Sequence, residues 1–432
     1  MGRPKKNFSG SSGYVPKKVG SLPGSIDLLT DSDSLSDLVL KKLQRISRVY
    51  GFSRVEFPIL EETRLFEQFY KDWPGKFSQV SSLLQSQNVG LRSSILPSAL
   101  RAYYEHKLFD KAPFQKWQYS GFVSKMEPDK GVIFQDFEFG MEIFGNFTHL
   151  AEAQTIAAVW ELMNSLGLPD AILEINNLGD ANCQKTYQDS LGDFLSGRKH
   201  DLCDSCNLHL QSRPLNILRC EKLDCQAIVS EAPTVLDYLS EDSNKHFTNI
   251  LEALDELGIA YQLNPLYSGP GGHTRTNFAV KYKIGDETFL IGEGGYHDNL
   301  IQNLCGKNYC CFGFTGSALV LRSLLETQKI EIQRDALSEV FLVPLGELAA
   351  KRALRLFRDL TSSKVSVNDN FGHIGVKNQL KMAESQKAPI ALIIGQKEAV
   401  EEMVILRDVK SGMQEIISYD KIVEEVKKRL GR

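Results

Sequence analysis

The stretch Gln118-Tyr-Ser-Gly-Phe-Val-Ser-Lys-Met-Glu-Pro-Asp-Lys-Gly-Val-Ile-Phe-Gln-Asp-Phe-Glu-Phe-Gly-Met-Glu-Ile-Phe-Gly145 has the layout of two strands joined by a loop. The first strand is expected to run to about Lys125, and Pro128 and Gly131 favour a turn after it. The second strand is expected from about Ile133 to Ile143, because apolar and other side chains alternate along most of it. The sequence therefore predicts an antiparallel hairpin.

The two faces of the second strand differ in character, because successive side chains of a strand point to opposite sides of its sheet. One face carries Asp136, Glu138 and Glu142. The other face is apolar and carries Phe137, Phe139, Met141 and Ile143. A sheet that packs one side on helices and lines a cleft with the other requires this pattern. We therefore expect an acidic cleft.

This hairpin resembles motif 2 of class II aminoacyl-tRNA synthetases, which binds ATP, and other segments extend the resemblance to the histidyl-tRNA synthetase family. Residues 51–66, which include Pro58, look like motif 1, the dimer interface of that class. Further similar segments follow in the family's order along nearly the whole chain: 91–92, 101–102, 105–106, 176–180, 213–220, 231–233, 292–298, 343–347, 379–383, 393–395 and 406–408. Membership does not by itself establish activity.

The resemblance implies an α+β fold with a class II antiparallel-sheet core at 22–328. It also implies a helical insertion at about 170–263 and a C-terminal α/β anticodon-binding-type domain at 329–432. Strands such as 340–343 and 391–394 alternate with amphipathic segments, which favours a mainly parallel sheet in that domain. Residues 1–21 are rich in Lys, Gly and Ser, and are expected to form a disordered basic arm.

Composition agrees with this organisation. The 432 residues, 42% of them hydrophobic, are enough for two or three cores. Lys and Arg number 50 against 54 Asp and Glu, a net charge of -4, so no global positive field indicates nucleic-acid binding. Any tRNA contact would be local, and the resemblance places it in the C-terminal domain. The resemblance also implies a homodimer, in which Leu60, Leu65 and Phe66 would bury apolar surface.

The sequence contains neither an apolar run long enough to span a membrane nor a signal peptide. Its eight cysteines suit a reduced, cytoplasmic protein better than a disulfide scaffold. Cys203, Cys206, Cys220 and Cys225 form two closely spaced pairs with a spacing compatible with tetrahedral zinc, and His200 and His209 lie nearby. The alternative is that these cysteines are ordinary core residues.

The resemblance implies arginines that bind the phosphates of ATP, and the hairpin of this chain lacks them. Lys125 stands at the position of the motif 2 Arg, which keeps the charge but loses the planar bidentate fork. Val132 and Phe134 stand where the family has further arginines.

Two later motifs have also lost their arginines. No Arg lies between Tyr261 and Arg275, in the segment similar to the first histidine-specific signature. In the segment similar to motif 3, Val320 takes the Arg position and Arg322 follows two residues later. Two residues turn a side chain by about 200° around a helix, so Arg322 is expected to face away from the cleft.

The remaining candidate substrate-binding residues are Arg92, Glu138, Glu142, Gly294, Gly295 and Tyr296. The resemblance implies that Glu142 holds the histidine imidazole, that Glu138 replaces a Gln, and that Ser94 replaces the Glu that holds the substrate amine. An acidic strand face favours a cation over a triphosphate, and histidine, another amine or no ligand all stay open. Glycine doublets at 271–272 and 294–295 could donate backbone N–H groups to an anion or simply form turns.

Three hypotheses follow. The first is a paralogue deficient in adenylation that binds tRNA or histidine or acts as a regulator, because losing several charge-assisted donors slows such a reaction by on the order of a million-fold. The second is an active histidine-tRNA ligase with an altered site, which would use ATP and Mg. The third is a regulatory subunit of ATP phosphoribosyltransferase, which usually lacks the C-terminal domain.

Overall fold

The computed structural model describes residues 30–70, 81–84, 88–111, 114–127, 132–269, 273–307, 309–328, 338–369 and 375–432. The chain divides into two compact units, one up to Ile330 and one from Glu331. The expected basic arm at 1–21 lies outside the described residues. So do Pro128 and Gly131 of the expected turn and the glycine doublet at 271–272.

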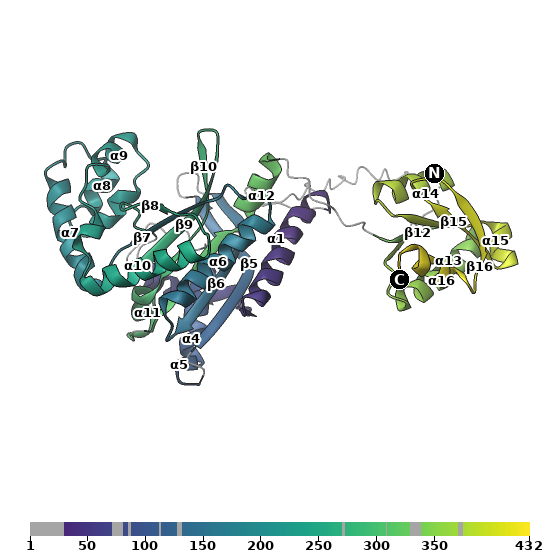
Figure 1. The fold of residues 1–432 in the computed structure, drawn as a ribbon, viewed down its shortest axis with the longest axis horizontal. Coiled ribbons are helices and arrows are strands. Elements are labelled where there is room, and N and C mark those ends of the chain that lie inside the picture. The colour runs from purple at the N-terminus through teal and green to yellow at the C-terminus, as the bar shows by residue number, and fades with distance from the viewer. Residues whose placement is uncertain are drawn as a thin grey trace, which may run out of the picture. The chain divides into compact units, whose positions relative to one another are not determined.

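An eight-stranded sheet forms the centre of the first unit, in the order β1-β5-β6-β11-β10-β9-β7-β8 (Figure 1). Its strands are β1 (Ser53–Arg54), β5 (Phe114–Glu127), β6 (Val132–Gly145), β7 (Ile172–Asn177), β8 (Gln262–Leu263), β9 (Thr274–Ile284), β10 (Glu287–Tyr296) and β11 (Cys311–Ser317). Every pair is antiparallel except the two outermost pairs, β1 with β5 and β7 with β8. The expected antiparallel core is therefore confirmed, with the quoted stretch as its β5–β6 hairpin.

The two faces of the sheet are used differently. Phe139, Met141 and Ile143 of β6 are completely buried, on the face expected to be apolar. Figure 1 shows α1 (Thr30–Val49), α6 (His149–Ser165) and α10 (Glu241–Glu256) running side by side along the sheet, and α6 packs against α1, α10, β6 and β11. The other helices of the sheet region are α2 (Thr63–Phe69), α4 (Leu96–Glu105), α5 (Leu108–Lys111), α11 (Asp298–Cys305) and α12 (Ala318–Thr327).

A small sheet lies beside these helices in the order β2 (Leu60–Glu62), β4 (Val89–Leu91) and β3 (Ser81–Leu84). The sequence predicted that Leu60, Leu65 and Phe66 of this region form a dimer interface. Leu65 and Phe66 are instead buried within their own chain, because α2 packs against α4 and α11. Leu60 is 49% exposed and its neighbour Ile59 is 46% exposed, so these two side chains offer apolar surface.

The helical insertion is narrower than the expected 170–263, because β7 and β8 at its two ends are strands of the main sheet. Its elements are α7 (Ala181–Ser196), α8 (Asp204–His209), η2 (Pro214–Arg219), α9 (Leu223–Val229), η3 (Val235–Tyr238) and α10. The Asp180 carboxylate caps α7 by accepting hydrogen bonds from the N–H groups of Asn182 and Cys183. The insertion has its own core, in which Tyr187 and Leu191 pack with Cys206 and Cys225.

The second unit contains a five-stranded sheet in the order β13-β12-β14-β15-β16. Its strands are β12 (Val340–Pro344), β13 (Val367–Asp369), β14 (Ile390–Ile394), β15 (Met403–Asp408) and β16 (Gln414–Ser418), and its helices are α13 (Glu347–Ser362), α14 (Val376–Ser385), α15 (Gln396–Glu401) and α16 (Ile422–Arg429). The expected mainly parallel sheet is wrong, because β12 pairs in parallel with β13 and β14 but the β14–β15 and β15–β16 pairs are antiparallel. The link from β15 to β16 is a tight turn with Gly412 at φ 77°, too short for a crossover.

Within the described residues, no helix has both the length and the apolar composition needed to cross a membrane.

Candidate ligand-binding site

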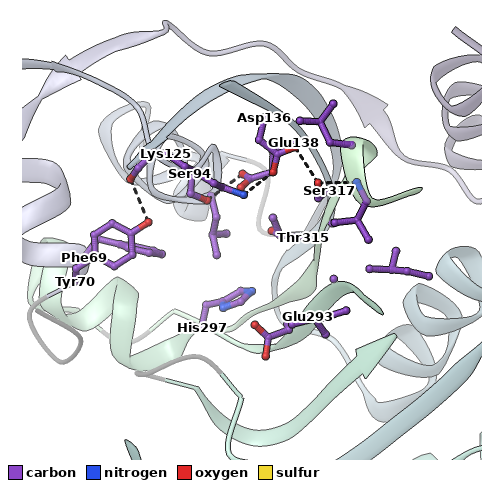
Figure 2. Close-up of a pocket in the computed structure, with 18 of the residues that line it drawn as sticks. Phe69, Tyr70, Ser94, Lys125, Asp136, Glu138, Glu293, His297, Thr315 and Ser317 are labelled. Atoms are coloured by element: carbon purple, nitrogen blue, oxygen red, sulfur yellow. Dashed lines mark hydrogen bonds and ion pairs between the residues drawn. The ribbon is translucent and has the colours of Figure 1, made fainter. Parts of the chain in front are cut away.

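A cavity of about 460 Å³ opens on the face of the main sheet that carries the acidic side chains of β6 (Figure 2). Its apolar wall comes from α2, α4, α11 and α12 and from two strands, and includes Phe69, Leu96, Phe134, Leu290, Leu300, Leu319 and Val320. Its polar wall includes Lys125, Asp136, Glu138, His273, Glu293 and His297. The prediction that one face of the β5–β6 hairpin lines a cleft is confirmed for Asp136 and Glu138.

Lys125 is the only Lys or Arg among the described side chains that line the cavity. Its Nζ lies 2.6 Å from Oδ2 of Asp136, whose carboxylate is almost fully buried. The other oxygen of Asp136 accepts hydrogen bonds from Ser317 Oγ at 2.8 Å and from the Phe137 N–H at 2.7 Å. Lys125 and Asp136 therefore neutralise each other, and the cleft face is less acidic than the sequence predicted.

Glu138 is buried and faces the cavity without a cation in contact. Its Oε1 accepts hydrogen bonds from Ser94 Oγ at 2.9 Å and from the Ile95 N–H at 2.6 Å. Burial raises the pKa of Glu138 above its ordinary value, although Lys125 and these two donors act in the opposite direction. Ser94, which the resemblance places at the position of an amine-binding Glu, here donates to Glu138 and orients its carboxylate.

Glu142 lies beneath the cavity and is not part of its lining. It is fully buried, and its Oε1 accepts a hydrogen bond from Tyr119 Oη at 3.2 Å. Its Oε2 lies 3.4 Å from Nε2 of His297 and accepts a hydrogen bond from Cys311 Sγ at 3.6 Å. The carboxylate that the resemblance assigns to a substrate imidazole therefore contacts an imidazole of its own chain.

Two histidines form part of the cavity that sequence reasoning missed. The rings of His273 and His297 pack nearly edge to face, with their centroids 4.8 Å apart. Burial, His297 and Arg219 together lower the pKa of His273 well below its ordinary value, so this imidazole is neutral at physiological pH. A signal was present, because both histidines lie in or beside segments similar to the two histidine-specific signatures.

Arg219, Tyr267 and Glu293 form a polar cluster that joins the insertion to the cavity wall. The Arg219 guanidinium, at the end of η2, donates two hydrogen bonds to the Glu293 carboxylate, at 2.9 and 3.2 Å. Tyr267 Oη donates to the same carboxylate at 2.9 Å. Glu293 lines both this cavity and a neighbouring one of about 410 Å³. No local sequence pattern indicates this pairing, because the partners are far apart in the chain.

The other predicted substrate-binding residues lie behind the cavity wall. Arg92 is 6% exposed, and its guanidinium donates hydrogen bonds to the carbonyl oxygens of Phe57, Pro58 and Phe122. Tyr296 is buried, and its hydroxyl donates to Glu152 at 2.6 Å. These two side chains bind other parts of the chain rather than the cavity.

Gly294 and Gly295 are in β10, where both pair with β9 on one side and β11 on the other. A Cβ at Gly294 would lie 2.3 Å from the Gly313 carbonyl oxygen and 2.5 Å from the Phe278 ring. The absence of side chains therefore allows close packing in the centre of the sheet, and neither glycine lines the cavity.

The prediction for the start of α12 is confirmed. Val320 lines the cavity. Arg322 donates a hydrogen bond to Glu326 of the same helix at 2.8 Å and is not among the lining residues. The positive charge of Arg322 is therefore directed away from the cavity.

The four predicted cysteine ligands meet in the insertion. The thiol sulfurs of Cys203, Cys206, Cys220 and Cys225 all lie within 4.8 Å of one another, with Cys203 and Cys220 4.0 Å apart. Tetrahedral zinc with Zn–S bonds of about 2.3 Å requires sulfurs about 3.8 Å apart, so the four thiols fit this ion. The N–H of Cys206 is the main reason why the pKa of Cys203 is lowered to about 7. The two nearby histidines, His200 and His209, are not part of the cluster.

Comparison with known proteins gives consistent matches for both units. The family model described as histidyl-tRNA synthetase matches residues 24–321, and the model described as anticodon binding domain matches 339–429. The chain is 28% identical over 419 residues to a histidine–tRNA ligase of Caldicellulosiruptor bescii, covering 96% of this chain and 99% of that protein. It is also 28% identical to the histidine–tRNA ligase of Halothermothrix orenii over 411 residues, which are 94% of this chain and 98% of that protein.

Two solved structures share the fold. The apo histidyl-tRNA synthetase of S. aureus superposes with a TM-score of 0.79 at 24% identity, covering 95% of this chain and all of that one. A protein of Bacillus halodurans described as an ATP phosphoribosyltransferase regulatory subunit/histidyl-tRNA synthetase superposes with a TM-score of 0.62 at 16% identity, covering 89% and 99%. The expected fold class, a synthetase-type antiparallel core followed by an anticodon-binding-type domain, is therefore confirmed.

Proposed function

Since the chain belongs to the histidyl-tRNA synthetase family, we propose that it is a paralogue deficient in adenylation that acts by binding tRNA or histidine, or as a regulator. One observation carries this proposal: the only Lys or Arg among the described cavity-lining residues, Lys125, is held 2.6 Å from Asp136. Adenylation needs fixed positive charge at the phosphates of ATP, because developing charge on the transferred group must be stabilised.

The size of the expected defect follows from the number of missing donors. One preorganised donor contributes about 3 kcal/mol to transition-state stabilisation, and several donors act as a unit. Val320 and Phe134 line the cavity with apolar surface at two of the positions where the resemblance implies an arginine. Activity lower by on the order of a million-fold is therefore expected.

Histidine-dependent exchange of pyrophosphate into ATP tests this proposal directly. The exchange is expected at background, because it requires ATP to bind productively in the cavity. Exchange within about a hundred-fold of an ordinary synthetase, abolished by Glu142→Ala, would instead favour the second hypothesis.

That second hypothesis is an active histidine-tRNA ligase with an altered site, for which ATP and Mg²⁺ would be cofactors. Similarity to histidine–tRNA ligases along nearly their whole length favours it. A regulatory subunit of ATP phosphoribosyltransferase is ranked lower, because the second unit from Glu331 matches an anticodon-binding domain.

The same domain is the basis for a tRNA contact. We infer that any tRNA binds locally through the second unit, since the net charge of the chain is -4. We also infer a homodimer, which the exposed Ile59 and Leu60 support. All eight cysteines are free, which supports a reducing, cytoplasmic location.

We further propose that Cys203, Cys206, Cys220 and Cys225 bind one zinc ion as thiolates. The four sulfurs come from different helices and loops of the insertion and are close enough for tetrahedral coordination. Such an ion would connect α8, α9 and the end of η2, and its contribution would be to the folding of the insertion.

A further inference from the structure

The charges that surround the main cavity do not balance. The described lining contains three carboxylates, those of Asp136, Glu138 and Glu293, and one ammonium group, that of Lys125. Lys125 is paired with Asp136, and Arg219 is paired with Glu293 from outside the lining. The remaining carboxylate, that of Glu138, has no cation in contact among the described residues.

Glu138 is built into this position rather than exposed by chance. Only 4% of its surface is exposed. Its two hydrogen bonds, from Ser94 and from the Ile95 N–H, both go to Oε1. The second oxygen, Oε2, accepts no hydrogen bond from any described residue. A buried carboxylate in this state is costly unless a cation or donor reaches it.

A second buried side chain of the cavity, His297, contacts Glu142 through its Nε2 but has no hydrogen-bond partner among the described residues at its other ring nitrogen, Nδ1. His297 is 2% exposed. Figure 2 shows His297 and Glu138 among the side chains that surround the cavity, with Thr315 between them in this view. The rest of the wall is largely apolar and includes Phe69, Leu96 and Leu300.

We infer that this cavity binds a monocationic amine with a flat or apolar body and no carboxylate, and that Glu138 holds its ammonium group. This inference rests on the proposed function, because it requires that Lys125 is not free to bind an anion. A zwitterionic amino acid would bring a carboxylate into a cavity whose described cations are already paired. Burying that unpaired carboxylate costs free energy, so the cavity is expected to bind the amine more tightly than the corresponding amino acid.

Matched pairs of ligands test the inference, because each pair differs only by a carboxylate. Histamine is compared with histidine, and tyramine with tyrosine, by titration calorimetry on the full chain at pH 8 and low salt. At least one amine is expected to bind at least about ten-fold more tightly than its amino acid, the equivalent of about 1.4 kcal/mol. Glu138→Gln should weaken amine binding by about ten-fold or more, since it removes the charge and keeps the acceptor oxygen for Ser94 and Ile95.

Glu287→Gln is the matched control, because Glu287 is an exposed residue of β10 outside the cavity lining and its loss changes the net charge equally. Amine affinity should be unchanged in this variant. The inference is overturned if no amine binds at millimolar concentration, if each amino acid binds as tightly as its amine, or if Glu138→Gln binds amines like the parent protein. Thermal unfolding of each variant verifies that it is folded.

Pyrophosphate exchange, measured on the same preparations, separates the two proposals. If pyrophosphate exchange is at background but histidine binds more tightly than histamine, only the present inference is contradicted. Exchange at a rate typical of a synthetase would remove the proposed function, whatever the calorimetry shows.

Discussion

The Lys125 ammonium lies 2.6 Å from the Asp136 carboxylate, across the β5–β6 hairpin. In this register Lys125 is opposite Phe134 and Asp136 is opposite Val123, so the pair is diagonal. Diagonal neighbours on one face of an antiparallel pair are within reach of a long side chain. Among the described residues, the only Lys or Arg that lines the cavity is therefore paired within the hairpin itself, which determines the chemistry expected of the site.

Replacing Lys125→Arg should not restore histidine-dependent pyrophosphate exchange. Arg would supply the bidentate geometry that Lys lacks, but Asp136 would still pair with it, and Val320 would still line the cavity. Exchange is measured in the parent and the variant with an ordinary synthetase as reference. A rise of about a hundred-fold or more in the variant would mean that one group limits the activity, contrary to this expectation.

Glu138→Gln should stabilise the protein at neutral pH and have little effect at acidic pH. Because burial raises the pKa of Glu138, the native state binds this proton more tightly than the unfolded state. The parent protein therefore loses stability as the pH rises from about 4.5, the unfolded value, through the raised native pKa. Gln has no such dependence. Urea unfolding at pH 4 and pH 8 should show the larger gain at pH 8; an equal gain at both values would contradict the assignment.

Arg92→Met should destabilise the first unit by about 3 kcal/mol, because it removes a buried guanidinium that donates hydrogen bonds to the carbonyl oxygens of Phe57, Pro58 and Phe122. Urea unfolding provides the measurement. Arg64→Met is the control, since Arg64 is an exposed residue of α2, and its loss should change the stability by less than about 0.5 kcal/mol. If Arg92→Met unfolds like the parent, Arg92 is not the structural residue that its contacts indicate.

Protein prepared without chelators should contain about one zinc ion per chain, and the double substitution Cys203→Ser, Cys206→Ser should remove it. Two of the four thiolate ligands would be lost, and the insertion should unfold at a lower temperature as a result. Elemental analysis and thermal unfolding are the measurements. Cys305→Ser is the control, because Cys305 lies in α11 outside the cluster and should not affect the metal. Parent protein without metal would rule out the zinc site.

Leu60→Asp should shift the protein from dimer to monomer at micromolar concentration. Leu60 is about half exposed in the single chain, and a charge there would be buried unpaired in a two-fold interface. Mass in solution is measured by light scattering. Ile416→Asp introduces the same charge at a more exposed apolar residue of the second unit and should leave the mass unchanged. A parent protein that is already monomeric would refute the dimer.

Much of the fold could be predicted from local patterns. The alternation along 133–143 and the turn residues before it indicate the hairpin, because a strand with period two has one apolar and one polar face. The spacing of Cys203, Cys206, Cys220 and Cys225 likewise predicted a cluster that the fold forms. The position of Val320 toward the cavity and of Arg322 away from it follows from helix geometry alone.

The prediction of a mainly parallel sheet in the second unit was wrong for a physical reason. Strands that alternate with helices favour crossovers, but the turn between β15 and β16 is too short for one, so the chain reverses there. The pattern of apolar residues is similar for both directions of pairing in a buried strand such as β14. Strand direction therefore depended on the lengths of the connections.

The sequence by itself determined the family and the antiparallel hairpin, because these depend on residue types at fixed spacing. The tertiary structure alone decided what the remaining charged groups do. Arg92 binds backbone carbonyls, Glu142 contacts His297, and Arg219 of the insertion pairs with Glu293 of β10. Each of these partners lies far away in the chain, so the distances and burial that control their charge arise only when the elements pack together.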